Sequence, residues 1–325
     1  MITKQDLLNV LAKAKNLKAT VIGDAMLDRY IYGTVDRISP EAPVPILAHQ
    51  RTELKAGGAA NVALNLAAWG CETSLVGLVG KDENAILLKD LLESRSIKHK
   101  LIACDSRPTT IKTRVVASSH HLLRIDQESS AYLAGDEEKM VINELIAFIE
   151  AEKPDIIILQ DYNKGMLTED LIQKVEKFCV GHDVYLAIDP KERNFSSYGH
   201  ADLFKPNLRE ASLAAKKTLK TDALSELAET WRKTRHLQTI AITLGSQGIF
   251  LQDEHNESHI RPSKEVDVVD VCGAGDAVIC SLAIGLISGL TLEKSGELAN
   301  LTGAFVCSHS GVVAIDTAEI MKWVS

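Results

Sequence analysis

The sequence predicts an α/β fold with a mostly parallel central sheet, because short β-branched apolar runs alternate with helical patterns along the chain. Five runs have the character of buried strands, and several end at Asp, Gly or Pro: residues 18–24, 73–80, 155–162, 184–191 and 239–245. Helices are predicted between them, over residues 61–69, 83–94, 136–152, 168–180 and 222–236. Strands that alternate with helices form βαβ units, so helices should cover both faces of the sheet.

Two regions interrupt this alternation, and both have a strand-like pattern without an intervening helix. They are residues 29–56 and 108–126. Pro40, Pro43 and Pro45 exclude a helix from the first region and suit extended or edge segments. We expect both regions to form antiparallel strands of a small β-sheet that acts as a lid on the main domain. The alternative is a pair of long surface hairpins without a role in catalysis.

The composition is that of an ordinary globular protein that can bury a sizeable core. The 325 residues are 46% hydrophobic and 25% charged, and we expect a single domain over residues 1–325. The net charge of −8 argues against a nucleic-acid surface, which needs a basic face. The longest apolar stretch, residues 277–290, is shorter than the ~18 residues that span a bilayer, so no membrane partner is expected.

Cysteine spacing and the first residues of the chain both favour the cytoplasm. The 6 cysteines form no CxxC pair and no zinc-binding spacing, which is typical of reduced thiols. Asp6 and Lys13 interrupt any apolar run near the N-terminus, so we expect no signal peptide.

Polar residues follow several of the predicted strands. Asp24, Asp161, Asp189 and Asn207 come after apolar runs, and Gly245 follows another. In open α/β sheets, ligands bind beyond the carboxyl ends of the strands. We therefore expect these groups to converge at one edge of the sheet, where a ligand would bind.

A glycine-rich turn at residues 273–275 predicts a phosphate site. Gly273, Ala274 and Gly275 precede Asp276, which begins a long apolar stretch that predicts a helix. The backbone N–H groups at a helix N-terminus are unpaired, and the helix dipole adds about half a positive charge there. Such a turn forms an anion hole, although the GxxxxGK[ST] pattern of a P-loop is absent. The alternative is an ordinary turn with a capping Asp.

A second glycine-rich turn suits a sugar. Gly57 and Gly58 run into a predicted helix that carries Asn61, whose amide can form hydrogen bonds to hydroxyls. Asp24 and Asp28 follow the first strand, and a carboxylate can accept hydrogen bonds from two vicinal hydroxyls. The alternatives are a tightly packed helix start for the turn and a capping role for Asp24 and Asp28.

Two further segments suit a nucleotide with its metal. Asn207 and Glu210 are three residues apart where a strand meets a helix, so both can face one way and order Mg²⁺ through its water shell. The segment from Thr243 to Gly248 places Gly245 and Gly248 at a strand end, where a nucleotide could lie on bare backbone. The alternative for Asn207 and Glu210 is a plain helix-capping pattern.

Together these residues predict phosphoryl transfer. The N-terminus of the helix would stabilise the migrating phosphoryl group, and Mg²⁺ would neutralise the triphosphate of ATP. Asp276 would take the proton from the attacking hydroxyl as a general base. Asp270 is expected to shape the loop before Asp276.

The chain resembles a known family, the ribokinase-like or phosphofructokinase B carbohydrate kinases. Two signatures carry the resemblance, GGAANVALNLAAWG at residues 57–70 and DVCGAGDAV at residues 270–278, together with the pair Asn207 and Glu210. The resemblance implies a three-layer α/β/α fold, ATP and Mg²⁺ as cofactors, and a lid that can pair between two subunits in a homodimer. One departure is Cys272, where most family members have Thr.

The resemblance also implies roles for individual residues. The residues of the anion hole and base are Gly273, Ala274, Gly275 and Asp276. The ATP–Mg²⁺ site would contain Asn207, Leu208, Arg209 and Glu210, with Glu210 on the metal through water, and Thr243, Gly245 and Gly248 would contact the nucleotide. Asp24, Asp28, Gly57, Gly58 and Asn61 would hold the sugar.

Further segments resemble a branch of the family that phosphorylates D-glycero-β-D-manno-heptose 7-phosphate at its anomeric hydroxyl. They are residues 21–47, 161–165, 188–191 and 206–211. This resemblance implies a 1,7-bisphosphate product and a place in ADP-heptose and lipopolysaccharide core biosynthesis. That kinase is often fused to a nucleotidyltransferase, but the HxGH motif is absent, so we expect no nucleotidyltransferase domain here.

A sugar phosphate as substrate needs cations. Lys164, Lys191, Arg114 and Arg124 are the candidates because each lies in or beside a lid segment or strand end, and the alternative for each is a solvated surface charge. A kinase of the same family that acts on a hexose phosphate, a pentose or a nucleoside is the first rival function. A non-catalytic sugar-binding protein is the second, and Asp276 counts against it because a binding protein needs no base.

Overall fold

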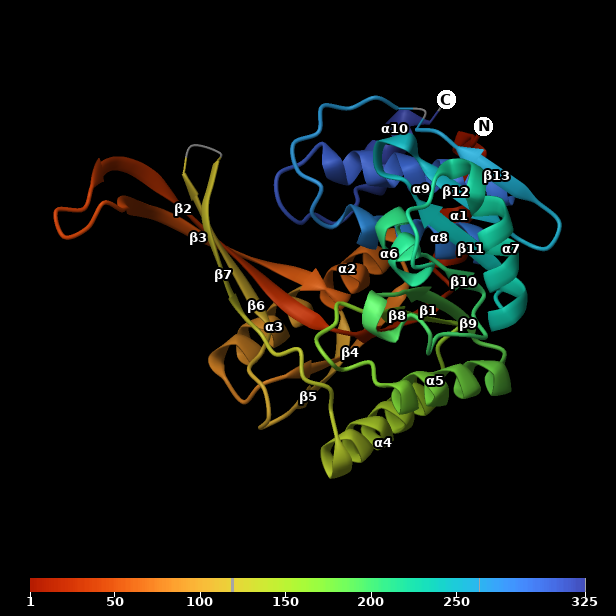
Figure 1. Ribbon diagram of the computed structural model, residues 1–325, viewed down its shortest axis with the longest axis horizontal. Helices are drawn as coiled ribbons and strands as arrows, with labels where there is room; N and C mark the ends of the chain where they lie inside the picture. The colour runs from red at the N-terminus through yellow and green to blue at the C-terminus, as the bar shows by residue number, and fades with distance from the viewer. Residues whose placement is uncertain (118–119, 263, 325) are drawn as a thin grey trace.

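The computed structural model describes residues 1–117, 120–262 and 264–324. Over these residues nine strands form one sheet in the order β13-β12-β11-β10-β9-β8-β1-β4-β5 (Figure 1). From one edge to the other they are β13 (Glu257–Ile260), β12 (Ile249–Gln252), β11 (Thr239–Thr243), β10 (Leu203–Phe204), β9 (Tyr185–Asp189), β8 (Ile156–Gln160), β1 (Lys18–Gly23), β4 (Glu72–Val79) and β5 (Lys98–Ala103). Neighbours from β11 to β5 pair in parallel, which confirms the mostly parallel sheet.

Helices cover both faces of the sheet and enclose a hydrophobic core on each. One core contains α1 (Lys4–Ala14), α2 (Ala59–Trp69), α3 (Glu83–Ser94), α8 (Ala274–Ile287), α9 (Leu292–Cys307) and α10 (Thr317–Trp323). The other contains α4 (Gly135–Glu152), α5 (Glu169–His182), α6 (Leu208–Ala214) and α7 (Leu224–Arg235). Ile156 and Ile158 of β8 face the first core, whereas Ile157 and Leu159 face the second, because successive side chains of a strand point to opposite faces. The three-layer α/β/α fold is therefore confirmed.

The strands and helices that the sequence predicts lie close to their predicted ranges, whereas β5, α9 and α10 are not among the predicted elements. Strands β12 and β13 form an antiparallel hairpin at one edge of the sheet that the sequence pattern does not predict. The apolar helix α8 begins at Ala274, so Asp276 lies inside its first turn and not at its first residue. None of the described helices has both the length and the apolar character that a membrane crossing requires.

The lid is a separate sheet that projects from the body (Figure 1). Among the described residues it contains β3 (Pro45–Gly58), β2 (Ala25–Ile38), β6 (Ile111–Ala117) and β7 (His120–Gln127), in that order. The expectation of a fully antiparallel lid is wrong, because β2 and β6 pair in parallel while the hairpins β2–β3 and β6–β7 are antiparallel. Both β2 and β6 begin at the body and run toward the tip of the lid, so they point in the same direction. Residues 118 and 119 of the expected lid segment lie outside the described residues.

Candidate active site

Asp276 is the centre of a buried hydrogen-bond network at the carboxyl edge of the sheet. Its side chain is 3% exposed. Oδ2 accepts a hydrogen bond from Asn61 Nδ2 at 2.7 Å. Oδ1 accepts one from the Tyr162 hydroxyl at 2.8 Å and one from Gln160 Nε2 at 3.3 Å. The carboxylate is therefore fixed by donors from α2, β8 and the loop that follows β8.

The surroundings of Asp276 tune it toward proton transfer near neutral pH. Its pKa is raised from 3.8 to about 6, mainly by burial and in part by the nearby Asp189 carboxylate. Hydrogen bonds from Asn61 and Tyr162 and the charge of Lys205 act in the opposite direction. A carboxylate with a pKa near 6 is mostly ionised at neutral pH and accepts a proton more readily than an ordinary Asp, as a general base must.

The turn before Asp276 has the geometry of an anion hole. Gly273 adopts φ 81°, and a Cβ there would lie 2.9 Å from Asn61 Nδ2, so only glycine fits. No side chain in the described part of the chain caps the first turn of α8. The N-terminus of this helix is therefore available to an anion, beside Ala274, Gly275 and Asp276.

Lys205 is a buried cation next to this turn, and it is not among the site residues that the sequence predicts. Lys205 is 3% exposed and its Nζ lies 3.0 Å from Asp189 Oδ2. Gln160 Nε2 also donates to Asp189 Oδ2, at 3.1 Å, so this amide connects Asp189 with Asp276. A lysine directly after the apolar pair Leu203–Phe204 is the signal that could have revealed it.

Asn207 and Glu210 form the N-terminal cap of α6. The Glu210 backbone N–H donates to Asn207 Oδ1 at 2.8 Å, and the Asn207 backbone N–H donates to Glu210 Oε2 at 2.8 Å, which is a capping box for α6. The other Glu210 oxygen accepts a hydrogen bond from Lys191 Nζ. Within the described residues no cluster of three or more His, Cys, Asp or Glu side chains could hold a metal by itself.

Lys191 lies with the predicted nucleotide residues and not with Lys164. Burial alone would lower the pKa of Lys191, but the Asp189 and Glu210 carboxylates raise it above the ordinary value. The ammonium also lies 5.4 Å from the ring centre of Tyr162. Lys191 is therefore a charged group between Glu210 and the Asp276 network.

The remaining predicted nucleotide residues surround the carboxyl end of β11. Thr243 ends that strand, and Gly245 has φ 61° with no atom within 4 Å of the position a Cβ would take, so its backbone is open. Gly248 differs, because a Cβ there would lie 2.0 Å from a carbonyl oxygen of β13. The close approach of β13 therefore explains why residue 248 is a glycine. Leu208 is half-buried at the start of α6, and Arg209 is exposed.

Asp24 holds a loop in place. Its carboxylate accepts hydrogen bonds from the backbone N–H groups of Tyr162 at 2.9 Å, Lys164 at 2.9 Å and Met166 at 3.3 Å. It is 4% exposed, and burial together with the Asp161 carboxylate raises its pKa to about 6. Because three backbone donors occupy Asp24, it positions the loop that carries Tyr162 and Lys164.

Asp28 is the carboxylate that lies against the second glycine turn. It is 3% exposed and forms an ion pair with Arg114 of β6. A Cβ on Gly57 would lie 2.3 Å from Asp28 Oδ2, and one on Gly58 would lie 2.3 Å from the Asp24 backbone oxygen. The absence of side chains at Gly57 and Gly58 therefore allows β3 to lie directly on both aspartates.

The other predicted cations lie on or beside the lid. Lys164 Nζ is 2.8 Å from Glu128 Oε1. Lys112, which is not among the predicted cations, lies 2.8 Å from the other oxygen of the same carboxylate. Arg124 is 59% exposed and pairs with Asp126 at 3.0 Å. Arg124 lies directly opposite Arg114 in the β6–β7 register, so both arginines are on one face of the lid.

Asp270 and Cys272 shape the loop before the anion hole. Asp270 accepts hydrogen bonds from the backbone N–H groups of Cys272 and Gly311, both at 3.0 Å. Burial and the Asp270 carboxylate raise the pKa of the Cys272 thiol to about 11. The thiol is therefore uncharged at neutral pH.

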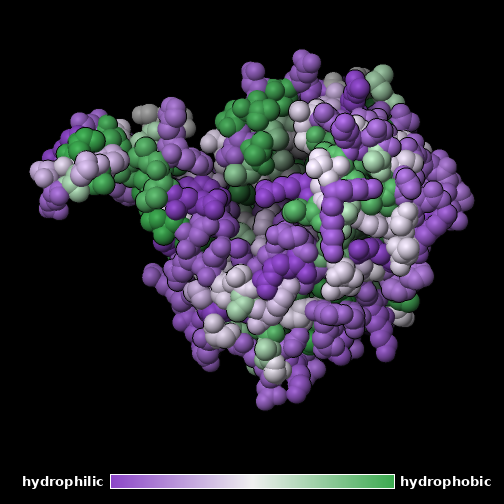
Figure 2. All heavy atoms as spheres, in the orientation of Figure 1, coloured by the Kyte–Doolittle hydropathy of each residue, from purple (hydrophilic) through white to green (hydrophobic). Residues whose placement is uncertain are grey.

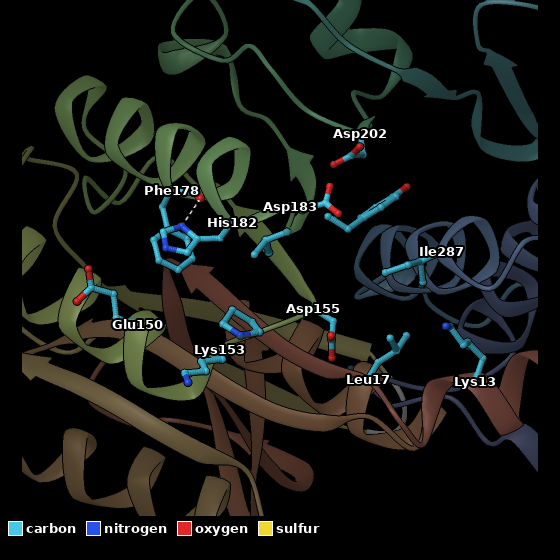
Figure 3. A pocket seen from close by; sticks show the side chains of 13 residues that line it. Lys13, Leu17, Glu150, Lys153, Asp155, Phe178, His182, Asp183, Asp202 and Ile287 are labelled. Carbon is cyan, nitrogen blue, oxygen red and sulfur yellow. Dashed lines mark hydrogen bonds between the residues drawn. The ribbon is translucent and has the colours of Figure 1, made fainter.

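A cavity of about 770 Å³ lies at the amino ends of the parallel strands, opposite the end where Asp276 lies (Figure 3). Its lining residues Leu17, Asp155, Val184 and Asp202 each precede a parallel strand and therefore mark the amino ends of those strands. The cavity contains none of the residues predicted for the active site.

Comparison with known proteins identifies the family. Residues 16–318 match the pfkB family carbohydrate kinase model. The chain is 40% identical over 302 residues to the bifunctional protein HldE of Methylobacillus flagellatus, covering 92% of this chain and 62% of the relative. It is 38% identical over 315 residues to the bifunctional protein HldE of Hyphomonas neptunium, covering 96% and 64%. The chain thus spans less than two thirds of the length of these relatives.

Solved structures share the fold at low sequence identity. Phosphofructokinase-2 from Escherichia coli in complex with potassium superimposes with a TM-score of 0.76 at 16% identity, covering 95% of this chain and 99% of that chain. Arabidopsis thaliana ribokinase complexed with ribose and ATP gives 0.69 at 18% identity, covering 94% and 99%. These structures share the fold, and the match over residues 16–318 shows that the chain belongs to the pfkB family of carbohydrate kinases.

Proposed function

We propose that this chain transfers the γ-phosphoryl group of ATP to the anomeric hydroxyl of D-glycero-β-D-manno-heptose 7-phosphate and releases the 1,7-bisphosphate and ADP. The observation that carries the kinase chemistry is the buried Asp276 carboxylate in the first turn of α8, next to an uncapped helix N-terminus. The heptose substrate is supported by the resemblance of residues 21–47, 161–165, 188–191 and 206–211 and by the similarity to the bifunctional HldE proteins.

The hydrogen bonds of Asp276 support Oδ2 as the oxygen that would act as the base. Among the described residues, Oδ1 accepts two hydrogen bonds and Oδ2 accepts only the one from Asn61. A carboxylate oxygen can accept two, so Oδ2 has room for the sugar hydroxyl. Its proton passes to Oδ2, the anomeric oxygen bonds to the γ-phosphorus, and the bond from that phosphorus to the bridging oxygen breaks. ADP leaves with the electron pair.

Glu210 and Asn207 supply oxygen ligands of the kind that Mg²⁺ prefers, so they fit a metal held partly through water. Bound there, Mg²⁺ would neutralise charge on the triphosphate. Glu210 has one oxygen on the Asn207 backbone and the other on Lys191, so Lys191 must share that carboxylate with the metal's water shell. Gly245 offers open backbone to the nucleotide at the end of β11.

The 7-phosphate is expected to contact the cations at the lid. Asp28, held by Arg114, and Asn61 would contact sugar hydroxyls beside Asp276. Lys164, together with Arg124 on the adjoining lid strand, would neutralise the far phosphate. Lys164 is 17% exposed and its partner Glu128 is accessible, so a phosphate could replace that carboxylate.

The lid also supports a homodimer. Its face that carries Tyr30 lies against the body, and the opposite face carries Ile31, Val115 and Leu123 in one row of cross-strand neighbours. Leu123 is 56% exposed and Ile125, on the same face, is 53% exposed. Apolar side chains gather along the lid in the space-filling view (Figure 2). A second lid would cover this surface. The reaction and the free cysteines suit the cytoplasm.

Phosphorus NMR of the reaction with ATP and heptose 7-phosphate tests the proposal. A new anomeric phosphate signal, absent with the Asp276→Asn variant, is the expected result. Fructose 6-phosphate and ribose serve as competing substrates in a coupled assay. Brisk turnover of either, with none of heptose 7-phosphate, would overturn the substrate assignment and leave the kinase chemistry, and no turnover of any sugar would overturn both.

A further inference from the structure

A turn of residues 308–312, which follows α9, lies directly against the lid, and we call it the linking turn. Lys55 Nζ of β3 donates a hydrogen bond to the Ser310 carbonyl oxygen at 3.3 Å. The Val312 backbone N–H donates a hydrogen bond to the Tyr30 hydroxyl of β2 at 3.4 Å. Both long lid strands therefore contact this turn, although they lie more than 250 positions away in the sequence.

Gly311, in the middle of the linking turn, shows how little space separates the turn from the lid. It has φ 66°, a left-handed conformation that favours glycine. A Cβ at this position would lie 3.0 Å from the Tyr30 hydroxyl and 3.2 Å from Lys55 Nζ. Tyr30 itself is buried, so its contact with the turn is not a loose surface contact.

The opposite side of the linking turn is bound to the loop that leads into the anion hole. The Gly311 backbone N–H donates to Asp270 Oδ2 at 3.0 Å. The other oxygen of this carboxylate accepts a hydrogen bond from the Cys272 backbone N–H, also at 3.0 Å. Val312 Cγ1 lies 3.5 Å from the position that a Cβ on Gly273 would take. A shift of the linking turn would therefore either break these contacts or move the loop.

The lid residues on the linking turn share a face of the lid with residues that are expected to bind the sugar. Tyr30 lies directly opposite Arg114 in the β2–β6 register, and Lys55 lies directly opposite Asp28 in the β2–β3 register. Because Asp28 and Tyr30 are two positions apart on β2, all four side chains are on one face. Arg114 Cζ is 5.2 Å from the centre of the Tyr30 ring. A sugar on this face would therefore fix the part of the lid that contacts the turn.

We infer that Tyr30 is a positioning residue through which a bound sugar sets the shape of the anion hole. The inference rests on the proposed function, in which the lid binds the sugar and the turn before Asp276 binds the γ-phosphoryl group. A sugar that fixes the lid also fixes Tyr30, which holds the linking turn through Val312. The linking turn holds Asp270, and Asp270 holds the backbone of Cys272 just before the anion hole. The sugar and the γ-phosphoryl group should therefore strengthen each other's binding.

The competing explanation is that Tyr30 only packs the lid against the body. A packing residue contributes to the free energy of unfolding, and its loss can weaken the binding of either ligand. It does not change how much one ligand strengthens the binding of the other, because that quantity is a coupling between two sites. The coupling between sugar and nucleotide therefore separates the two roles.

The experiment measures the Kd of the non-hydrolysable ATP analogue AMP-PNP with Mg²⁺, without and with saturating heptose 7-phosphate. The ratio of the two Kd values is the coupling factor, and we expect it to be at least about fivefold in the wild type. Tyr30→Phe keeps the ring and removes the hydroxyl. It should lower the coupling factor about two- to tenfold, the range for one neutral hydrogen bond, and leave the Kd of AMP-PNP alone unchanged. ADP, which lacks the γ-phosphoryl group, should show a smaller coupling factor than AMP-PNP.

Tyr32→Phe is the matched control. Tyr32 is two positions from Tyr30 on β2 and therefore on the same face, but the centre of its ring lies 4.0 Å from Cζ of Arg51 in the lid itself. This variant should keep the wild-type coupling factor. Asp270→Asn tests the other end of the chain of contacts, because it leaves one acceptor oxygen for two N–H donors. It should lower the coupling factor, and Tyr30→Phe should lower it no further in that background.

Four results would overturn the inference. They are no coupling in the wild type, an unchanged coupling factor in Tyr30→Phe, an equal fall in Tyr32→Phe, and equal coupling with ADP and AMP-PNP. Independent effects of Tyr30→Phe and Asp270→Asn would also overturn it. Lys55→Met, which removes the donor to Ser310, covers the case in which Tyr30→Phe does not fold. It too should lower the coupling factor, and an unchanged factor would contradict the inference.

Failure of the proposed function is recognised separately, as absence of wild-type turnover with heptose 7-phosphate, since the coupling factor needs no turnover. If the wild type turns over fructose 6-phosphate or ribose instead, that sugar replaces heptose 7-phosphate in the binding measurement. The expected results for the variants then stay the same.

Discussion

Tyr162→Phe is the change that most directly tests how the fold tunes Asp276. The Tyr162 hydroxyl donates to Asp276 Oδ1 at 2.8 Å, and the other donor to that oxygen, Gln160 Nε2, is more distant at 3.3 Å. The hydrogen bond from Tyr162 stabilises the ionised carboxylate and so opposes burial, which by itself raises the pKa of Asp276. Removing the shorter hydrogen bond should therefore raise that pKa above its value of about 6.

The size of the shift follows from the energy of the hydrogen bond. A hydrogen bond to a charged group contributes about 1.5–3 kcal/mol, and about 1.4 kcal/mol corresponds to one pKa unit. We expect the pKa of Asp276 to rise by about one to two units. Because the base works in its ionised form, the acid limb of the kcat/KM profile should move from about pH 6 to about pH 7–8.

The assay is kcat/KM from pH 5 to pH 9 for the wild type, Tyr162→Phe and Tyr132→Phe. Tyr132 is the control, because its hydroxyl donates to Asn194 Oδ1 at 2.6 Å, away from Asp276. Tyr162→Phe should approach wild-type activity at the alkaline end of this range, where its carboxylate is ionised again. An acid limb at the wild-type position, or an equal loss of activity at every pH, would refute the reasoning.

Three further predictions concern the roles of single side chains. Asp276→Asn should lower kcat by at least ~10²-fold with little change in ATP affinity, and retention of more than a third of kcat would contradict a general base. Lys164→Ala should raise the KM of the sugar phosphate, whereas Lys191→Ala, which removes the partner of Glu210, should raise the KM of ATP more; identical effects on both substrates in the two variants would contradict these assignments. Ile125→Glu should convert a dimer to monomers in size-exclusion chromatography, and an unchanged elution volume would show that the lid is not the interface.

The sheet and its helices could be predicted because their signals are local. Each β-branched run is bounded by turn residues, and each helix has its own apolar period, so neither depends on distant contacts. The hairpin of β12 and β13 is not predicted, because β13 lacks such a local signal. Its strands have four residues each, and β13 contains Glu257, Ser258 and His259, so no apolar run marks it.

The partners of the site residues are decided by the fold and not by local pattern. Asp24 resembles a sugar-binding carboxylate in the sequence, but its donors come from residues about 140 positions further along the chain, where the β8 loop returns to β1. The sequence pattern groups Lys191 with Lys164, because both lie in or beside strand ends. The register of β9 and β10 instead brings Lys191 to Glu210, and it brings the overlooked Lys205 to Asp189.

A base that is buried to raise its pKa should also destabilise the protein. Asp276 is uncharged in the folded protein below pH 3.8, and its contribution to stability is lost as the pH rises from there through about 6. About two pKa units correspond to roughly 3 kcal/mol, which Asp276→Asn avoids because an amide stays neutral.

The difference in the free energy of unfolding between the wild type and Asp276→Asn should depend on pH, because the carboxyl group titrates and the amide does not. The new amide must meet Asn61 Nδ2, so Asn61 has to turn, which offsets about 1 kcal/mol of the gain at every pH. The advantage of Asp276→Asn over the wild type in urea unfolding should still shrink by roughly 1.5 kcal/mol between pH 8 and pH 5, whatever the offset. A difference that does not change with pH would mean that Asp276 is not held as a buried carboxylate at neutral pH. The physical basis for its role as the base would then be lost.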